Sequence, residues 1–271
     1  MIDLSSSTDP RIAVAGQVLG EIAALTRRDN VPLMVVGATA RDILSASIVG
    51  SLPTRATTDI DVAVAVPSWV AFDALTSRLD RVGRSRHRYR VSGVDVDVLP
   101  FGDVETSERL LDWGDGARMN ARGLSEAFAA SECVRLPGGA EVAVPTVAGL
   151  AVLKLSAWSD RRLETRRDAV DLQTIIGWYM TGTFLDELYD TEVDLLEACD
   201  FDPDLVAAHR LGRDMAQLLG ESARPALALL ADDKPARLAA DMPTSVGDQA
   251  GIVRSLRAGL EAAVRAAEGA L

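Results

Sequence analysis

The sequence predicts an α+β protein, with a mixed β-sheet flanked by helices and then a mainly helical half. Short apolar runs typical of strands alternate with helical periodicity over the first 144 residues. Two of these runs begin with paired aspartates, Asp59 with Asp61 and Asp95 with Asp97. The rest of the chain is dominated by Ala, Leu and Arg at helical spacing. We therefore expect two domains, 1–144 and 145–271.

Composition limits the classes of function. The 271 residues are 48% hydrophobic, which is enough for a core, and no run of 18 apolar residues predicts a membrane span. The first residues lack the basic and apolar regions of a signal peptide, and the two cysteines match no metal-binding spacing. These features favour a reduced, cytoplasmic protein. With two histidines in the chain, any metal chemistry must use carboxylates.

The net charge of −12 opposes nonspecific binding of the whole surface to nucleic acid, but the charge is uneven. Residues 181–271 carry 17 acids and 8 Lys and Arg residues, whereas residues 1–180 are nearly balanced. One segment contains six arginines, which are Arg78, Arg81, Arg84, Arg86, Arg88 and Arg90. These arginines are candidates for binding a triphosphate, a leaving pyrophosphate or an RNA backbone. The alternative is a solvated edge strand that its charge protects from aggregation.

The first elements predict a phosphate site. Residues 11–28 have the spacing of an amphipathic helix, with Asp9 as its N-cap. Residues 32–36 form a short apolar strand that leads directly into Gly37, Ala38 and Thr39. A strand, a glycine turn and a helix start attract anions, because free N–H groups point outward and the glycine has no Cβ. The alternative is a strand-to-helix turn with no ligand.

The strand that starts at Asp59 carries the main candidate site. Residues spaced i, i+2 on a strand share one face, so Asp59 and Asp61 lie side by side. Two such acids repel each other unless a cation neutralises them, and Mg²⁺ prefers carboxylate oxygens. Asp95 and Asp97 repeat the arrangement, and carboxylates from two neighbouring strands can hold two metal ions. The alternative is a strand that ends in solvent.

Further elements follow in order. Ser68 caps a helix expected over 69–80, and residues 86–90 form a strand that turns at Ser92-Gly93 into the Asp95/Asp97 strand. A second hairpin is expected over 133–144. Residues 145–157 predict a buried helix in which Lys154 either reaches solvent or enters a site.

The last part of the chain predicts helices over about 160–172, 205–220, 222–231 and 247–269. In the first of them Asp168 and Asp171 lie one turn apart, and Asp168 either orients Lys154 or pairs with surface arginines. The nine acids between Asp186 and Asp204 alternate with leucines, so this segment is folded. It is either a docking face for a basic partner or a solvated surface.

The motifs together resemble the polymerase-β-type nucleotidyltransferases, and more closely the AbiEii/AbiGii-type nucleotidyltransferase toxins. That family includes mycobacterial toxins that modify tRNA 3′ ends. The matching segments are 36–40, 55–61, 96–101, 150–158 and 167–172.

This resemblance implies that an NTP donates its NMP to an acceptor hydroxyl, with RNA such as the tRNA 3′ end as acceptor. It also implies a toxin with a cognate antitoxin. Asp59, Asp61 and Asp97 would bind two Mg²⁺ ions, with Asp97 on the ion that activates the hydroxyl. The residues implied to line the nucleotide are Gly37, Ala38, Thr39 and Thr58. Lys154 would hold the triphosphate, and Asp168 would complete the catalytic set.

The sequence shows one departure from the family pattern, a second resemblance and two alternative functions. Ala38 stands where the family usually has Gly or Ser, so a serine hydroxyl contact is lost. Residues 37–42 also resemble the turn of CCA-adding enzymes, but residues 98–130 lack the Arg-Arg-Asp segment that follows in those enzymes. The acceptor is alternatively a small hydroxyl compound or a protein side chain. The chain is alternatively a nucleotide-binding module without activity.

Overall fold

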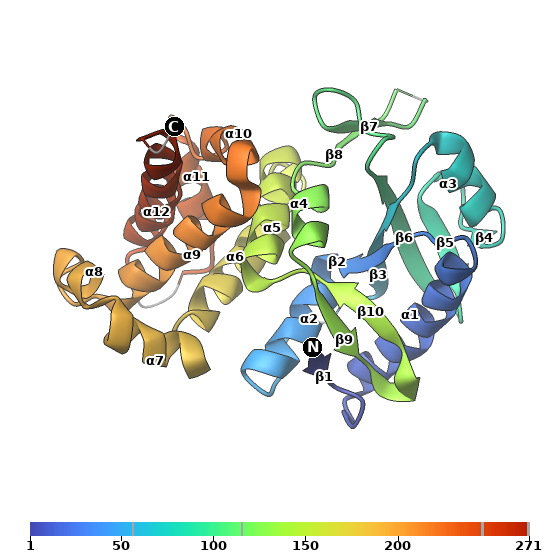
Figure 1. Ribbon diagram of the computed structural model, residues 1–271, viewed down its shortest axis with the longest axis horizontal. Helices are drawn as coiled ribbons and strands as arrows, with labels where there is room; N and C mark the ends of the chain where they lie inside the picture. Colours follow the sequence, from blue (N-terminus) through green and yellow to red (C-terminus); the bar gives the residue numbers. More distant parts are fainter. Residues whose placement is uncertain (56, 115, 245–246, 270–271) are drawn as a thin grey trace. The chain divides into compact units, whose positions relative to one another are not determined.

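A computed structural model describes residues 1–55, 57–114, 116–244 and 247–269 (Figure 1). Ala56, which belongs to the segment 55–61 discussed above, lies outside the described residues. The chain divides into two compact units, Met1–Thr146 and Val147–Leu271. Across the described ranges, no helix combines the length and the apolar character that crossing a bilayer requires.

The first unit contains a mixed sheet. Its described strands, in spatial order, are β1 (Ile2–Asp3), β9 (Glu132–Arg135), β10 (Glu141–Val144), β2 (Leu33–Val36), β3 (Asp59–Ala65), β6 (Val94–Phe101), β5 (Arg88–Val91) and β4 (Asp80–Arg81). The pairs β1–β9, β10–β2 and β3–β6 are parallel, and the other neighbours are antiparallel. The predicted α+β class, with a mixed sheet and helices around it, is confirmed.

Helices α1 (Pro10–Arg28) and α2 (Gly37–Ile48) pack against this sheet, and α1 contacts β10, β2 and β5 (Figure 1). The predicted cap is present, because Asp9 accepts a hydrogen bond from the Arg11 N–H. On β3, Ile60, Val62 and Val64 are buried, as expected for alternate positions on one side of a strand. The opposite side of β3 is therefore left for the acidic residues.

Other parts of this unit differ from the prediction. Helix α3 (Trp69–Thr76) begins after the expected Ser68 cap but ends four residues early. Asp80 and Arg81 pair instead with β5, so strand pairing overrides helical periodicity there. The segment 103–133, for which the sequence predicts loop and helix, contains the short helix α4 (Leu124–Ala129) and also a ribbon that was not expected, β7 (Leu110–Asp112) with β8 (Arg118–Asn120). Both predicted hairpins are confirmed, and the one between β5 and β6 turns at Ser92 and Gly93, which have positive φ.

The second unit is helical, as predicted. Its described α-helices are α5 (Val147–Arg161), α6 (Arg167–Trp178), α7 (Gly182–Thr191), α8 (Val193–Ala198), α9 (Pro203–Leu219), α10 (Ala223–Ala228), α11 (Lys234–Asp241) and α12 (Gln249–Gly269). Helix α11 was not expected from the sequence. The acidic segment forms α7 and α8, where Leu188 and Leu196 pack with Val206, so this segment is folded, as expected.

Helices α9 and α12 pack with their backbones in contact. A Cβ atom on Gly212 of α9 would lie 2.0 Å from the Leu256 carbonyl oxygen, and one on Gly259 of α12 would lie 1.9 Å from the His209 carbonyl oxygen. These two glycines therefore set the distance between the helices, and no side chain fits at either position.

We expect Gly259→Ala to lower the free energy of unfolding by about 1–3 kcal/mol, because the added methyl group forces the helices apart. Gly177→Ala is the matched control, since nothing lies within 4 Å of a Cβ there. That change should be neutral or should stabilise by up to about 1 kcal/mol through helix propensity. Urea unfolding measures both variants, and equal losses would contradict this account of the helix contact.

Candidate active site

The carboxylates of β3 and β6 form one array on one face of the sheet. The two strands are parallel and in register, with Asp59 opposite Asp95 and Asp61 opposite Asp97. All four side chains are partly exposed, whereas Ile60 and Val96 on the other face are buried. The sequence pattern therefore produces a two-by-two set of acids at the strand starts.

Arg88 on β5 neutralises part of this carboxylate array. It lies opposite Asp97 in the β5–β6 pairing, and its Nε and Nη2 atoms donate to the two Asp97 carboxylate oxygens, each at 2.7 Å. The same Nη2 atom lies 3.5 Å from Asp59 Oδ2. These partners raise the pKa of Arg88, through the hydrogen bond to Asp97 first and the charge of Asp97 next. A single guanidinium thus links the acids of two strands.

The oxygen atoms of the carboxylate array are chemically suited to bind Mg²⁺, because Mg²⁺ prefers hard oxygen ligands and these carboxylates lie together on one partly exposed face. Their present arrangement is set by arginines: Arg88 holds Asp97, and Arg90 pairs with Asp95 at 2.6 Å. In the part of the chain that the structure describes, no three acidic, imidazole or thiol groups converge closely enough to hold an ion. An ion on Asp97 would therefore have to replace the contacts of Arg88.

The glycine turn lies beside the carboxylate array. Val36 at the end of β2 pairs with Asp61, and Gly37 follows as the first residue of α2 with φ of +65°. A Cβ atom at Gly37 would lie 2.0 Å from Asp61 Oδ2 and 2.9 Å from Asp61 Cβ. Only glycine permits both this backbone conformation and this close approach. The start of α2, whose first N–H groups have no partner within the helix, thus adjoins Asp61.

A cavity of about 280 Å³ adjoins Asp59. Thr39, Thr57 and Thr58 line it together with apolar residues of α1, such as Ile12. The Thr57 hydroxyl donates to Asp59 Oδ1 at 2.6 Å, so it fixes one oxygen of that carboxylate. The volume is near the lower end for small-molecule sites. Two residues expected to line the nucleotide, Thr39 and Thr58, thus share a cavity with Asp59.

A buried ion pair that was not singled out from the sequence supports the loop before β3. Arg41 is 1% exposed, its guanidinium donates to Asp42, and its Nη2 atom also donates to the Arg55 carbonyl oxygen at 2.9 Å. Arg11 lies 3.5 Å from the same Asp42 carboxylate and donates to the Pro53 carbonyl oxygen. In the sequence, the adjacent residues Arg41 and Asp42 after the glycine turn indicate this ion pair.

The six arginines between Arg78 and Arg90 do not form one free basic surface. Four make ion pairs with acids: Arg78 with Asp29, Arg86 with Asp73, Arg88 with Asp97 and Arg90 with Asp95. Arg81 and Arg84 are exposed and make no ion pair among the described residues. The positive charge that this segment offers to an external anion is therefore smaller than its composition suggests.

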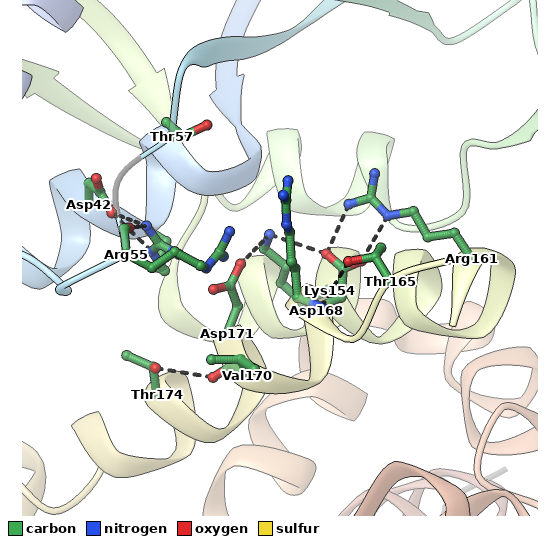
Figure 2. Close-up of polar contacts among 12 residues, drawn as sticks. Asp42, Arg55, Thr57, Lys154, Arg161, Thr165, Asp168, Val170, Asp171 and Thr174 are labelled. Carbon is green, nitrogen blue, oxygen red and sulfur yellow. Dashed lines mark hydrogen bonds and ion pairs between the residues drawn. The ribbon is translucent and has the colours of Figure 1, made fainter. Parts of the chain in front are cut away.

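Lys154 and Asp168 belong to a buried charge cluster in the second unit. Figure 2 shows Lys154 between two carboxylates, with its Nζ atom 3.3 Å from Asp168 Oδ1 and 2.6 Å from Asp171 Oδ2. Arg161 donates from Nε and Nη2 to both oxygens of Asp168, at 2.8 and 2.9 Å. Lys154 is 5% exposed, so it does not reach solvent as a long side chain usually does.

Comparisons with known proteins identify no family for this chain. The sequence matches no protein-family model and no curated protein. Similar solved structures include the antibiotic-resistance factor ANT(2″)-Ia, with a TM-score of 0.38 and 13% identity over 69% of this chain and 95% of that one. An antigenic nucleotidyltransferase-like protein from Paracoccidioides brasiliensis has a TM-score of 0.42 and 17% identity, covering 75% and 93%. A Thermotoga maritima CCA-adding enzyme complexed with tRNA has a TM-score of 0.24 and 11% identity, covering 96% and 82%. Likeness at this level does not assign a function.

We expect Gly37→Ala to lower the free energy of unfolding by about 1 kcal/mol more than Gly50→Ala does. Both glycines have positive φ, which costs an L-residue about 1–2 kcal/mol. A Cβ at Gly50 meets nothing within 4 Å, whereas one at Gly37 overlaps Asp61. Thermal unfolding of the two variants measures the difference. Equal losses would mean that Asp61 moves aside at no cost.

Burial alone would raise the pKa of Asp168, but hydrogen bonds from Arg161 and the charge of Lys154 outweigh it and lower the pKa below 3.8. The pairing of Asp168 therefore stabilises the folded chain above about pH 4, and this contribution is lost as the pH falls through the lowered value. We expect Asp168→Asn to destabilise by about 3–5 kcal/mol at pH 7.

The difference in free energy of unfolding between the wild type and Asp168→Asn should become smaller below about pH 4. Urea unfolding across pH 3–7 measures this difference. Asp190→Asn is the control, because Asp190 is an exposed acid of the same unit. A difference in free energy of unfolding that does not change with pH would contradict the stabilising role of the Asp168 ion pairs.

Proposed function

We propose that the chain is a metal-dependent nucleotidyltransferase that moves an NMP from an NTP onto an acceptor hydroxyl. The observation that carries this proposal is the carboxylate array of β3 and β6, set beside the glycine turn at the start of α2. This combination offers carboxylate oxygens for metal ions and backbone N–H groups for phosphates on neighbouring elements. The resemblance of the sequence motifs to nucleotidyltransferases agrees with it.

Asp59, Asp61 and Asp97 are the residues proposed to hold two Mg²⁺ ions. When bound, Mg²⁺ lowers the pKa of an acceptor hydroxyl and stabilises the departing pyrophosphate. Thr57 keeps the Asp59 carboxylate oriented, and Gly37 lets the turn approach Asp61. The start of α2 receives phosphate oxygens through its N–H groups, and the Thr39 and Thr58 hydroxyls add donors. Lys154 and Asp168 stay predicted contributors to nucleotide binding.

RNA is the proposed acceptor, with tRNA favoured by the family resemblance. A toxin role with a cognate antitoxin rests on that resemblance alone. Arg81 and Arg84 are the arginines that support RNA binding, because they are exposed and make no ion pair among the described residues. A second candidate is a small hydroxyl acceptor. It is favoured by the pairing of the other four arginines with acids of the chain.

The test incubates the chain with each α-³²P-labelled NTP, Mg²⁺ and either total RNA or a panel of small hydroxyl compounds. We expect label on an acceptor, and a loss of roughly 100-fold or more in Asp61→Asn, because one carboxylate of the array is removed. Asp73→Asn is the matched control, since Asp73 lies on α3 and pairs with Arg86. Absence of transfer to every acceptor by the folded chain would refute the proposal.

The acceptor is decided by a double variant, Arg81→Gln with Arg84→Gln. If RNA is the acceptor, this variant should transfer less label to RNA, and its activity should depend less steeply on salt. Transfer to a small acceptor should be unchanged. Label only on small compounds, unaffected by the variant, would select the second candidate.

A further inference from the structure

Arg88 and Arg90 lie on the same strand and face, yet they contact the carboxylate array differently. Arg90 makes an ion pair with one acid, Asp95. Arg88 occupies both oxygens of Asp97 and also reaches Asp59 on the neighbouring strand β3. The Asp97 side chain is 13% exposed and that of Arg88 is 38% exposed. Arg88 is thus anchored on Asp97 while one side of it faces solvent.

The oxygens that Arg88 binds are two of those that a divalent cation would need. Bidentate contact uses both oxygens of Asp97, so an ion and the guanidinium cannot bind them together. Without either cation, the acids of the carboxylate array would repel one another. Arg88 therefore supplies the charge that a metal ion would supply, on the same atoms.

We propose that Arg88 is an internal counter-ion that competes with the divalent cation for Asp97 and Asp59. The inference rests on the proposed function, since that function supplies the metal. Metal binding then requires the guanidinium to leave, and its exposed side allows it to turn toward solvent. A nucleotide phosphate gives the departing guanidinium a new anionic partner, because Arg binds phosphate as it binds carboxylate. Metal and nucleotide consequently favour each other's binding, by the same factor in both directions.

The test measures Mn²⁺ binding to the full chain without nucleotide, by the loss of the free Mn²⁺ signal in electron paramagnetic resonance. We expect Arg88→Gln to bind Mn²⁺ at least about tenfold more tightly than the wild type, since a charge-assisted bidentate contact no longer competes. Arg90→Gln removes the same charge from the same face, and it should change the affinity by less than about threefold. Unchanged or weaker binding by Arg88→Gln would overturn the proposal, and so would equal tightening in both variants.

A second variant locates the competition. Adding Asp97→Asn to Arg88→Gln should abolish the gain in Mn²⁺ affinity, whereas a gain that survives would place the ion elsewhere and overturn the proposal. Arg88→Lys keeps the charge but loses the planar fork, so a gain smaller than that of Arg88→Gln is expected. If Arg88→Gln does not fold by circular dichroism, Arg88→Lys carries the test alone, and the absence of any gain then overturns the proposal.

The readout separates this inference from the proposed function, because Mn²⁺ binding needs neither NTP nor acceptor. Tighter Mn²⁺ binding in Arg88→Gln, together with no label transfer by the wild type, would support the counter-ion role and refute the enzyme. If the wild type transfers label but Arg88→Gln binds Mn²⁺ no more tightly, the proposed enzyme activity would be supported and the counter-ion role of Arg88 would be refuted.

Discussion

Crowded negative charge on one face of the sheet is the constraint on which the first unit depends. Four carboxylates lie in register on two parallel strands, at a spacing that would drive them apart in the absence of cations. Arg88 and Arg90 on the next strand provide those cations. The strand order β3-β6-β5 is therefore an electrostatic arrangement as well as a hydrogen-bonded one, with positive charge on the strand nearest the paired acids.

In the second unit, opposite charges are paired in a cluster that is mostly buried. Lys154 lies between the buried carboxylates of Asp168 and Asp171, and the exposed Arg161 reaches in to pair with Asp168. Such a cluster is costly to disrupt, because removal of one member leaves its partners buried and uncompensated. The two units thus treat charge differently: the acids of the first unit are partly exposed, whereas Asp168, Asp171 and Lys154 of the second are buried.

Local patterns predicted much of the fold and of the candidate site. Period-two alternation placed the four aspartates on one face, and Ser92-Gly93 fixed the hairpin that brings Arg88 opposite Asp97. The early end of α3 could not be predicted, because Asp80 and Arg81 pair with a strand seven or more residues away. The contacts of Arg88 with Asp97 and Asp59 could not be predicted either. Alternation along a strand determines the face on which a side chain lies, but not whether the side chain bends toward a neighbour or extends into solvent.

The hairpin register also bears on how the sheet assembles. Strands β5 and β6 are joined by a two-residue turn, so their pairing is local and is expected to form early in folding. Strand β3 must join β6 across a much longer stretch of chain, and it brings two further acids. In that order of events, Arg88 and Arg90 would neutralise the acids of β6 before β3 pairs with it, so that the parallel pairing would meet a charge-balanced strand. Because one hairpin carries both the acids of β6 and their arginines, we expect the sheet to assemble with less self-repulsion than if the arginines lay on a distant strand.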